Sequence, residues 1–339
     1  MFEYGEIQEK SIKLSKKIYI NKQLIEKILK NSGINQNILT LEKPKIWIMQ
    51  SQKIILADGN SLFLKLGIND DWTDSSSIKS QVTATKLIKS LGITQPEIIS
   101  FSDNKKTYGY LFILSEPQKG EKLYHYYNDS SKCEKEMIYN ALAISYSKIH
   151  SIKNNWSGLW SEGDSSVKKY SIHPSEFYFK AELINGSGKY LFENNIIEKK
   201  LLDKICAIWE RNLNYLINRP STLVHISPFP WSIYLTKSKE KMFEVSGFNA
   251  VGDFMWWDYM SDVAHILYPP FLDISDNERK SFINNYNLKI DDLSLNLYIL
   301  LNRICAMAGC YFAPVNIDYS NKWIEKERLT LKNIIKKFM

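Results

Sequence analysis

Cysteine is scarce in this sequence of 339 residues, and the four cysteines do not form a metal-binding pattern. They make no C-x-x-C pair and have no histidine partner at metal-ligand spacing, which argues against a zinc site. Two of them fall in an apolar run of helical character and are interpreted as small core residues. The cysteines are Cys133, Cys206, Cys305 and Cys310. The cysteines therefore predict no zinc site.

Long hydrophobic runs are also missing. The first residues, MFEYGEIQEKS, contain no apolar segment of the signal-peptide type, and no later run reaches the length of a membrane span. These absences predict a cytoplasmic, reduced protein with no membrane partner.

The charge is mild, and no arginine-rich patch is present. Charged residues make up 24% of the chain, the formal net charge is +7, and the lysines occur in small clusters such as Lys199–Lys200. Such clusters are typical of solvated helix faces, so no nucleic-acid partner is expected. The chain is long enough for two lobes with a large core, and its 44% hydrophobic residues include 20 Tyr, 15 Phe and 9 Trp.

The periodicity of apolar residues changes along the chain. The N-terminal third reads as a helix, a group of strands, a second helix that closes at Gly92, and two more strands. The expected ranges are helices 20–31 and 75–91 and strands 46–49, 53–56, 61–66, 96–100 and 108–114. The rest reads as mainly helical, with a long connector over 161–188. The helices expected in this remaining part of the chain are 132–152, 196–216, 256–267, 276–287, 293–310 and 321–337.

Two segments carry the strongest signal: LVHISPFPWSIYL at Leu223–Leu235 and EVSGFNAVGDFMWWD at Glu244–Asp258. They resemble the active-site core of the aminoglycoside phosphotransferase and choline kinase family, relatives of the protein kinases. There the first segment reads L-V-H-G-D-L-H-x-x-N-I-L and the second I-D-W-E-x-A-x-x-G-D-x-x-x-D. The resemblance implies an α+β, bilobal protein-kinase-like fold with a small antiparallel β-sheet lobe and a larger helical lobe. The implied parts are a small lobe at 1–114, a hinge at 115–121 and a large lobe at 122–339.

The polar groups of that family's chemistry are missing. The resemblance puts Ser227 at the catalytic-base position, Ser232 at the metal-binding Asn position and Ser246 at the metal-binding Asp position. A one-residue shift that puts Val245 at the last position gives no ligand either. Serine supplies no charge to hold Mg²⁺ and, at its ordinary pKa, cannot accept the proton of a substrate hydroxyl. The sequence therefore predicts that base and metal ligands are lost together.

Remnants of a nucleotide site are implied by the same resemblance. Lys65 stands at the position of the nucleotide-binding lysine, Gln81 replaces the glutamate that pairs with it, and Ser115 and Glu116 open the hinge. The hinge acts through its backbone, so we expect ATP binding that is weak and independent of Mg²⁺, and no required cofactor. His225 and His150 are interpreted as structural.

We therefore predict a pseudokinase that binds a small molecule or a protein partner in the cleft between the lobes. Phe229 and Trp231 replace polar cleft residues and favour an uncharged or aromatic ligand. Two alternatives stay open. One is a working small-molecule phosphotransferase with relocated ligands, Glu244 or Asp253. The other is an enzyme that reuses the cleft through Lys65, His225 and Ser227.

Overall fold

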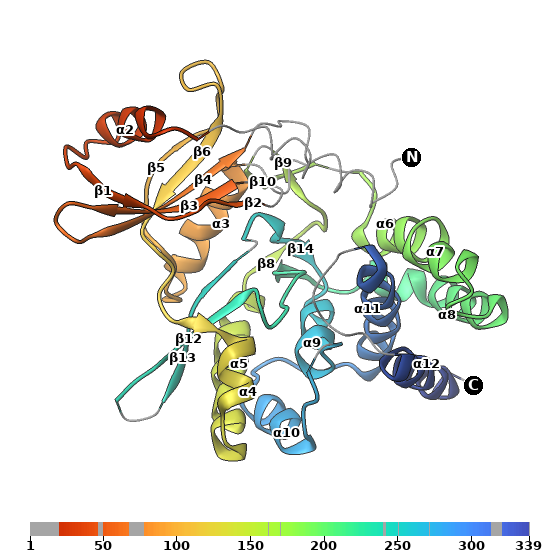
Figure 1. Ribbon diagram of the computed structural model, residues 1–339. Coiled ribbons are helices and arrows are strands. Elements are labelled where there is room, and N and C mark those ends of the chain that lie inside the picture. Colours follow the sequence, from red (N-terminus) through yellow and green to blue (C-terminus); the bar gives the residue numbers. More distant parts are fainter. Residues whose placement is uncertain are drawn as a thin grey trace. The chain divides into compact units, whose positions relative to one another are not determined.

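The chain folds into two compact units, each assembled from separated stretches of sequence. The first unit contains residues 1–129, 160–167 and 230–254, and the second contains 130–159, 168–229 and 255–339. The computed structural model (Figure 1) describes residues 20–46, 50–67, 78–161, 163–169, 171–239, 242–249, 251–270, 272–312 and 321–338. Among the described residues, no helix combines the length and the apolar character that a bilayer crossing requires.

The first unit is built on a six-stranded antiparallel sheet. Its strands lie in the order β1-β3-β4-β6-β5, and β2 pairs with β3 outside this path. The strands are β1 (Ile38–Leu41), β2 (Lys45–Ile46), β3 (Gln50–Leu56), β4 (Ser61–Gly67), β5 (Ile98–Ser102) and β6 (Leu111–Ser115). Burial alternates along β3 and β4, as the period of a strand requires, and one face of the sheet therefore forms a core.

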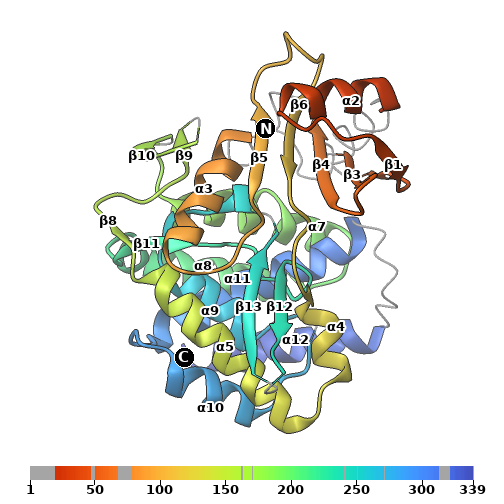
Figure 2. The ribbon, with the colours of Figure 1, turned by 90° about the vertical axis from the view of Figure 1, so that its left-hand side faces the viewer.

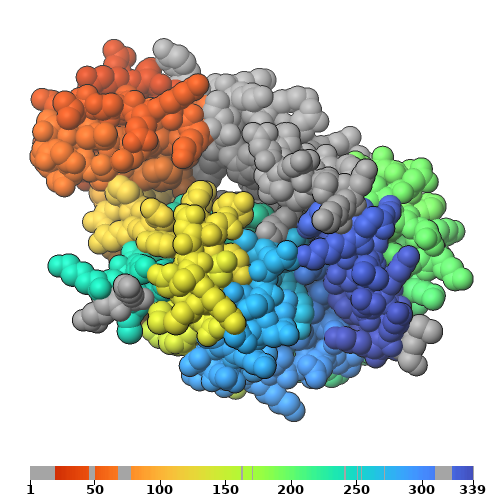
Figure 3. All heavy atoms as spheres, turned by 60° about the horizontal axis from the view of Figure 1, so that its bottom comes forward, coloured from red at the N-terminus to blue at the C-terminus, as the bar shows by residue number. Residues whose placement is uncertain are grey.

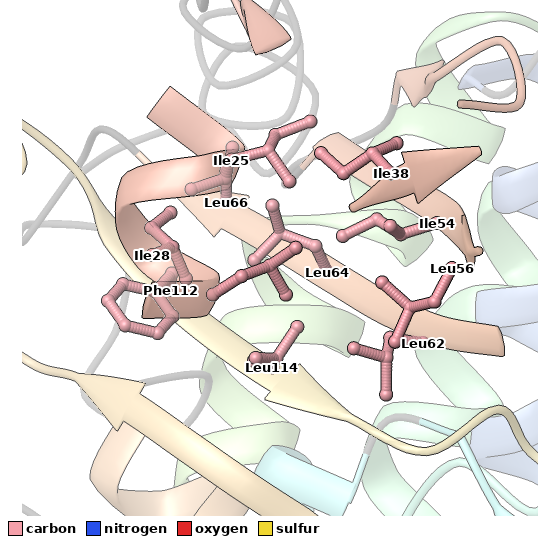
Figure 4. Close-up of a cluster of buried hydrophobic side chains, with 11 residues drawn as sticks. Ile25, Ile28, Ile38, Ile54, Leu56, Leu62, Leu64, Leu66, Phe112 and Leu114 are labelled. Carbon is pink, nitrogen blue, oxygen red and sulfur yellow. The ribbon is translucent and has the colours of Figure 1, made fainter. Parts of the chain in front are cut away.

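Two helices accompany this sheet. Helix α2 (Lys22–Asn31) begins at Asn21, whose side chain accepts a hydrogen bond from the Leu24 N–H, and buries Ile25 and Ile28 against the sheet. Figure 4 shows these side chains meeting leucines of β3 and β4 and Phe112 of β6. Helix α3 (Ile78–Ser90) lies alongside β5 and β6 (Figure 2). The first unit thus has a sheet with separate apolar contacts to each helix.

A second, three-stranded sheet completes the first unit. Its strands lie in the order β13-β12-β7, all antiparallel, so the end of the predicted hinge pairs with a hairpin more than 100 residues later. The strands are β7 (Glu121–Lys122), β12 (Ile233–Lys237) and β13 (Phe243–Phe248); α4 (Leu123–Asp129), the pair β9 (Trp160–Ser161) and β10 (Asp164–Lys168), and the short 3₁₀ helix η2 (Val251–Asp253) also belong here. This pairing carries the first unit past the expected boundary at 114–122, to residue 129.

The second unit is mainly helical, around a small sheet in the order β14-β11-β8. Helix α5 begins at a capping box of Ser131 and Glu134, and α10 packs against α5 (Figure 3). The strands are β8 (Lys153–Asn154), β11 (Ser221–Val224) and β14 (Met255–Trp257). The helices are α5 (Lys132–His150), α6 (Pro174–Tyr178), the π-helix η1 (Phe179–Ile184), α7 (Ser187–Glu193), α8 (Lys199–Ile217), α9 (Met260–Leu267), α10 (Asp276–Asn285), α11 (Asp292–Phe312) and α12 (Asn321–Lys336).

The predicted α+β class, with a small antiparallel sheet and a helical part, is confirmed. Three predictions of local structure were wrong or incomplete. The 161–188 connector contains helical segments (α6, η1 and the start of α7), and β1 was missed. Residues 255–257 form a strand instead of the start of a helix, because Met255, Trp256 and Trp257 pair with the strand before His225. Most of the expected strand 46–49 lies outside the described residues.

Candidate functional site

The loop that follows β11 in the second unit is held by one buried carboxylate. Asp262, on α9, accepts the N–H of His225 through Oδ2 at 2.6 Å and the N–H of Ile226 through Oδ1 at 2.8 Å. Ile226 has a φ of +66°, a left-handed conformation that a β-branched residue rarely adopts. The family motif has glycine at this position. The carboxylate thus satisfies two backbone donors that a strained turn leaves without a regular partner.

Two histidines extend the network around Asp262. His150 Nε2 lies 3.1 Å from Asp262 Oδ2 and its Nδ1 lies 2.7 Å from the Tyr286 hydroxyl, while His225 Nδ1 lies 3.1 Å from the Tyr146 hydroxyl. Both histidines and Asp262 are fully buried. Burial by itself raises the pKa of Asp262, but hydrogen bonds and charge from His150 and His225 outweigh it and lower the pKa. Asp262 is therefore an anion at neutral pH.

The rest of the loop contains a tight turn and an aromatic contact. The Ser227 carbonyl accepts the N–H of Phe229 at 2.7 Å, and the Phe229 ring meets His265 edge-on, with 5.2 Å between ring centroids. Ser227 itself is half-buried. His225 Nδ1 faces the Tyr146 hydroxyl, and this contact does not build a Ser227–His225 nucleophile.

In the first unit, Lys65 and Gln81 lie on β4 and α3, and both of these elements contact β6. Lys65 lies on β4 opposite Ile113 of β6, and its half-buried side chain has a pKa lowered by burial. Gln81 is a buried residue of α3, the helix that lies alongside β5 and β6. A desolvated ammonium at this position favours an anionic ligand group.

The predicted hinge begins with groups that are already hydrogen-bonded within the protein. The Ser115 hydroxyl donates to the Glu116 carbonyl at 2.9 Å, and the Glu116 N–H donates to the Glu97 carbonyl at 2.9 Å. Both groups of the Glu116 backbone are thus engaged by neighbours in the first unit. The adenine base of a nucleotide that bonded to the same backbone groups would compete with these hydrogen bonds.

The two serines at the predicted metal positions also belong to the first unit. Ser232 precedes β12 and is buried, and its carbonyl accepts the N–H of Asn249 at 2.7 Å. Ser246 lies within β13, is 3% exposed, and donates its hydroxyl to the Lys119 carbonyl at 2.8 Å. The Ser246 hydroxyl is therefore directed at the hinge.

The proposed replacement ligands lie elsewhere on the same strand and just after it. Glu244 is exposed between the buried Phe243 and Val245, as strand alternation predicts. Asp253 ends η2. Among the described residues, no group of three or more His, Cys, Asp and Glu side chains is arranged to hold a metal ion.

Sequence reasoning missed two residues of this region. Asp262 was included in a predicted helix without a role, although its place four residues after Asp258 was visible. Asn249 was passed over beside Ser246; its amide donates to the Tyr234 hydroxyl at 3.1 Å, and its backbone contacts Ser232. The signal in both cases is a polar residue next to a motif position, and only the fold shows what it contacts.

Comparison with known proteins establishes the fold. No family model matches the sequence, and no curated protein matches it. Among solved structures, the chain is similar to the GDP complex of aminoglycoside 2'-phosphotransferase-IIIa, with a TM-score of 0.63 at 12% identity, covering 94% of this chain and 100% of the other. It is also similar to the ADP-bound aminoglycoside phosphotransferase APH(2'')-Ib, with a TM-score of 0.56 at 18% identity, covering 93% and 97%.

An amicoumacin kinase in complex with AMP-PNP, Ca²⁺ and its ligand is similar as well, with a TM-score of 0.54 at 12% identity, covering 94% of each chain. At such identities the likeness concerns the fold. The chain therefore has the kinase-like fold of the aminoglycoside phosphotransferases.

Proposed function

We propose that the protein is a pseudokinase that binds a small molecule or a protein partner and does not transfer phosphate from Mg·ATP. The observation that carries this proposal is the contrast around the loop after β11. The supporting frame of Asp262, His150 and His225 is complete, whereas the adjoining position for a catalytic base holds Ser227. We expect this combination in a protein that has lost catalysis and kept its fold, because the residues that support the loop remain and the reactive group does not.

The residues at the predicted metal positions do not fit Mg²⁺. The ion prefers oxygen ligands in octahedral geometry, and carboxylates supply the charge that holds it beside phosphates. Ser232 and Ser246 supply neutral hydroxyls, and the Ser246 hydroxyl is already bonded to the Lys119 carbonyl. We therefore derive no phosphoryl-transfer step for this chain.

Nucleotide binding is expected to be weak. The similar structures were solved with GDP, ADP or AMP-PNP, so a nucleotide is the natural reference ligand. In this chain Lys65 remains to meet a phosphate, but Gln81 supplies no charge beside it. Each lost hydrogen bond to a charged group costs about 1.5–3 kcal/mol. We expect ATP to bind in the millimolar range, with no gain from Mg²⁺.

The test combines turnover with binding. ATP hydrolysis and transfer to a panel of aminoglycosides and small amino alcohols would be measured, together with thermal-shift titrations of ATP with and without Mg²⁺. We expect no turnover above that of a Lys65→Ala control and the same small shift with or without the metal. Turnover that disappears in Glu244→Ala or Asp253→Ala would overturn the proposal in favour of a phosphotransferase with relocated ligands.

A further inference from the structure

The end of the hinge is joined to the β12–β13 hairpin by backbone pairing. Glu121 and Lys122 of β7 pair with Leu235 and Tyr234 of β12, all in the first unit. The three residues before this pairing, 118–120, are irregular. Their carbonyl groups have no partner in a strand ladder and can accept hydrogen bonds from side-chain donors or from water.

Two side chains supply such donors in opposite directions. Gln118 Nε2 donates to the Ser246 carbonyl at 2.6 Å, and Ser246 Oγ donates to the Lys119 carbonyl at 2.8 Å. Gln118 Nε2 also lies 3.1 Å from the Lys119 carbonyl. Each segment thus donates one side-chain hydrogen bond to a backbone carbonyl of the other.

The close approach requires a glycine on each side. A Cβ at Gly120, whose φ is +81°, would collide with the Leu235 carbonyl and come within 2.7 Å of Ser246 Oγ. A Cβ at Gly247 would collide with the side-chain amide of Gln118. Gly120 therefore packs against the backbone of β12, and the Gln118 amide lies over Gly247 of β13.

We propose that Gln118 and Ser246 form a clasp that fixes the hinge on β13, and that Ser246 is a positioning residue of the hinge. Its hydroxyl proton is donated to the Lys119 carbonyl. The clasp does not depend on the proposed function, because it holds the hinge equally in an active or an inactive protein. In Ser246→Asp the Lys119 carbonyl would lose its hydrogen-bond donor, so we expect this substitution to loosen the hinge.

Hydrogen exchange of the hinge amides tests the clasp directly. The variants are Ser246→Ala, Gln118→Ala and the pair together, and the matched control is Ser227→Ala, another serine at a predicted catalytic position. A lost neutral hydrogen bond should speed exchange over residues 119–122 by about fivefold to tenfold in each single variant. The control should leave these amides unchanged.

The double variant distinguishes a clasp from two separate contacts. Because each partner helps to hold the other, the pair together should speed exchange by less than the product of the single effects. Unchanged exchange at 119–122 in both single variants, or effects that multiply, would overturn the clasp.

Ser246→Asp provides the second readout. We expect hinge exchange at least as fast as in Ser246→Ala. Slower exchange than in Ser246→Ala would overturn the assignment of Ser246 to the hinge. If the Asp variant does not fold, the two alanine variants decide. Turnover of the unmodified protein would contradict the proposed function and leave the clasp standing.

Discussion

The loop after β11 and the end of the hinge are both irregular segments, but they are fixed by opposite chemistry. The loop presents two backbone N–H groups and is held by an acceptor, the Asp262 carboxylate. The hinge presents a carbonyl at Lys119 and is held by a donor, the Ser246 hydroxyl. In each segment the side chain complements the backbone group that it meets. A carboxylate can accept hydrogen bonds from the loop N–H groups, but it cannot donate one to the hinge carbonyl.

The two anchors also differ in strength. Hydrogen bonds to an ionised group are worth roughly twice as much as neutral ones. The loop bonds are accepted by an ionised and fully buried carboxylate, whereas the clasp is neutral. We expect the loop to tolerate change less than the hinge does.

Replacing Asp262 should therefore have the largest effect. Asp262→Asn puts an amide donor where one of two backbone N–H groups needs an acceptor, and it removes the partner of His150. Breaking such a buried arrangement typically costs about 3–5 kcal/mol. Urea unfolding would measure the loss in the free energy of unfolding. Asp203→Asn, on the exposed face of α8, is the control and should change stability by less than about 0.5 kcal/mol. Equal stabilities of the two variants would show that the loop does not depend on its anion.

A smaller effect is expected from Gly247→Ala in the first unit. The added methyl group would displace the end of the Gln118 side chain, and alanine at a φ of +153° is strained, which typically costs about 1–3 kcal/mol. Adding Gln118→Ala removes the obstacle and should return part of the lost stability, although the backbone at φ +153° remains unfavourable for alanine. Thermal unfolding of the wild-type protein, both single variants and the double variant would measure this. A double variant less stable than Gly247→Ala alone would contradict the packing of Gln118 over Gly247.

The last effect is absent at neutral pH; it concerns the loss of stability in acid and lies beside the loop. Burial lowers the pKa of His265 from 6.5 to about 4. Because the folded pKa is the lower one, the unfolded chain takes up this proton first as the pH falls. The contribution of His265 to stability is complete above pH 6.5 and is lost between pH 6.5 and about 4, by at most about 1.4 kcal/mol per pH unit.

His265→Gln should flatten the dependence of stability on pH in that window. His173, whose pKa burial also lowers to about 4, remains in the variant and leaves part of the slope. Unfolding free energies measured every half pH unit between pH 4 and 7 would show the difference. Identical slopes for wild type and variant would mean that the pKa of His265 is the same in the folded and unfolded states.

Much of the secondary structure could be predicted from the sequence because it rests on local patterns. Alternating apolar residues marked β4, helical spacing marked α5, and Gly92 marked the end of α3. The strand β14 could not be found this way. Its aromatic residues also fit a helix, and pairing with the distant β11 decides its conformation.

For the candidate site, too, some features follow from the sequence and others from the tertiary structure. The sequence by itself determined which residue types stand at the motif positions, because Ser227, Ser232 and Ser246 are read directly from the chain, and with them the absence of carboxylates there. What these side chains contact was decided by the tertiary structure. Ser246 meets Lys119 across 127 positions of sequence, and Asp262 reaches His225 across 37. Bonds of this kind depend on how distant elements pack, and the packing follows from burial of the whole apolar surface and not from the residues that make the bond.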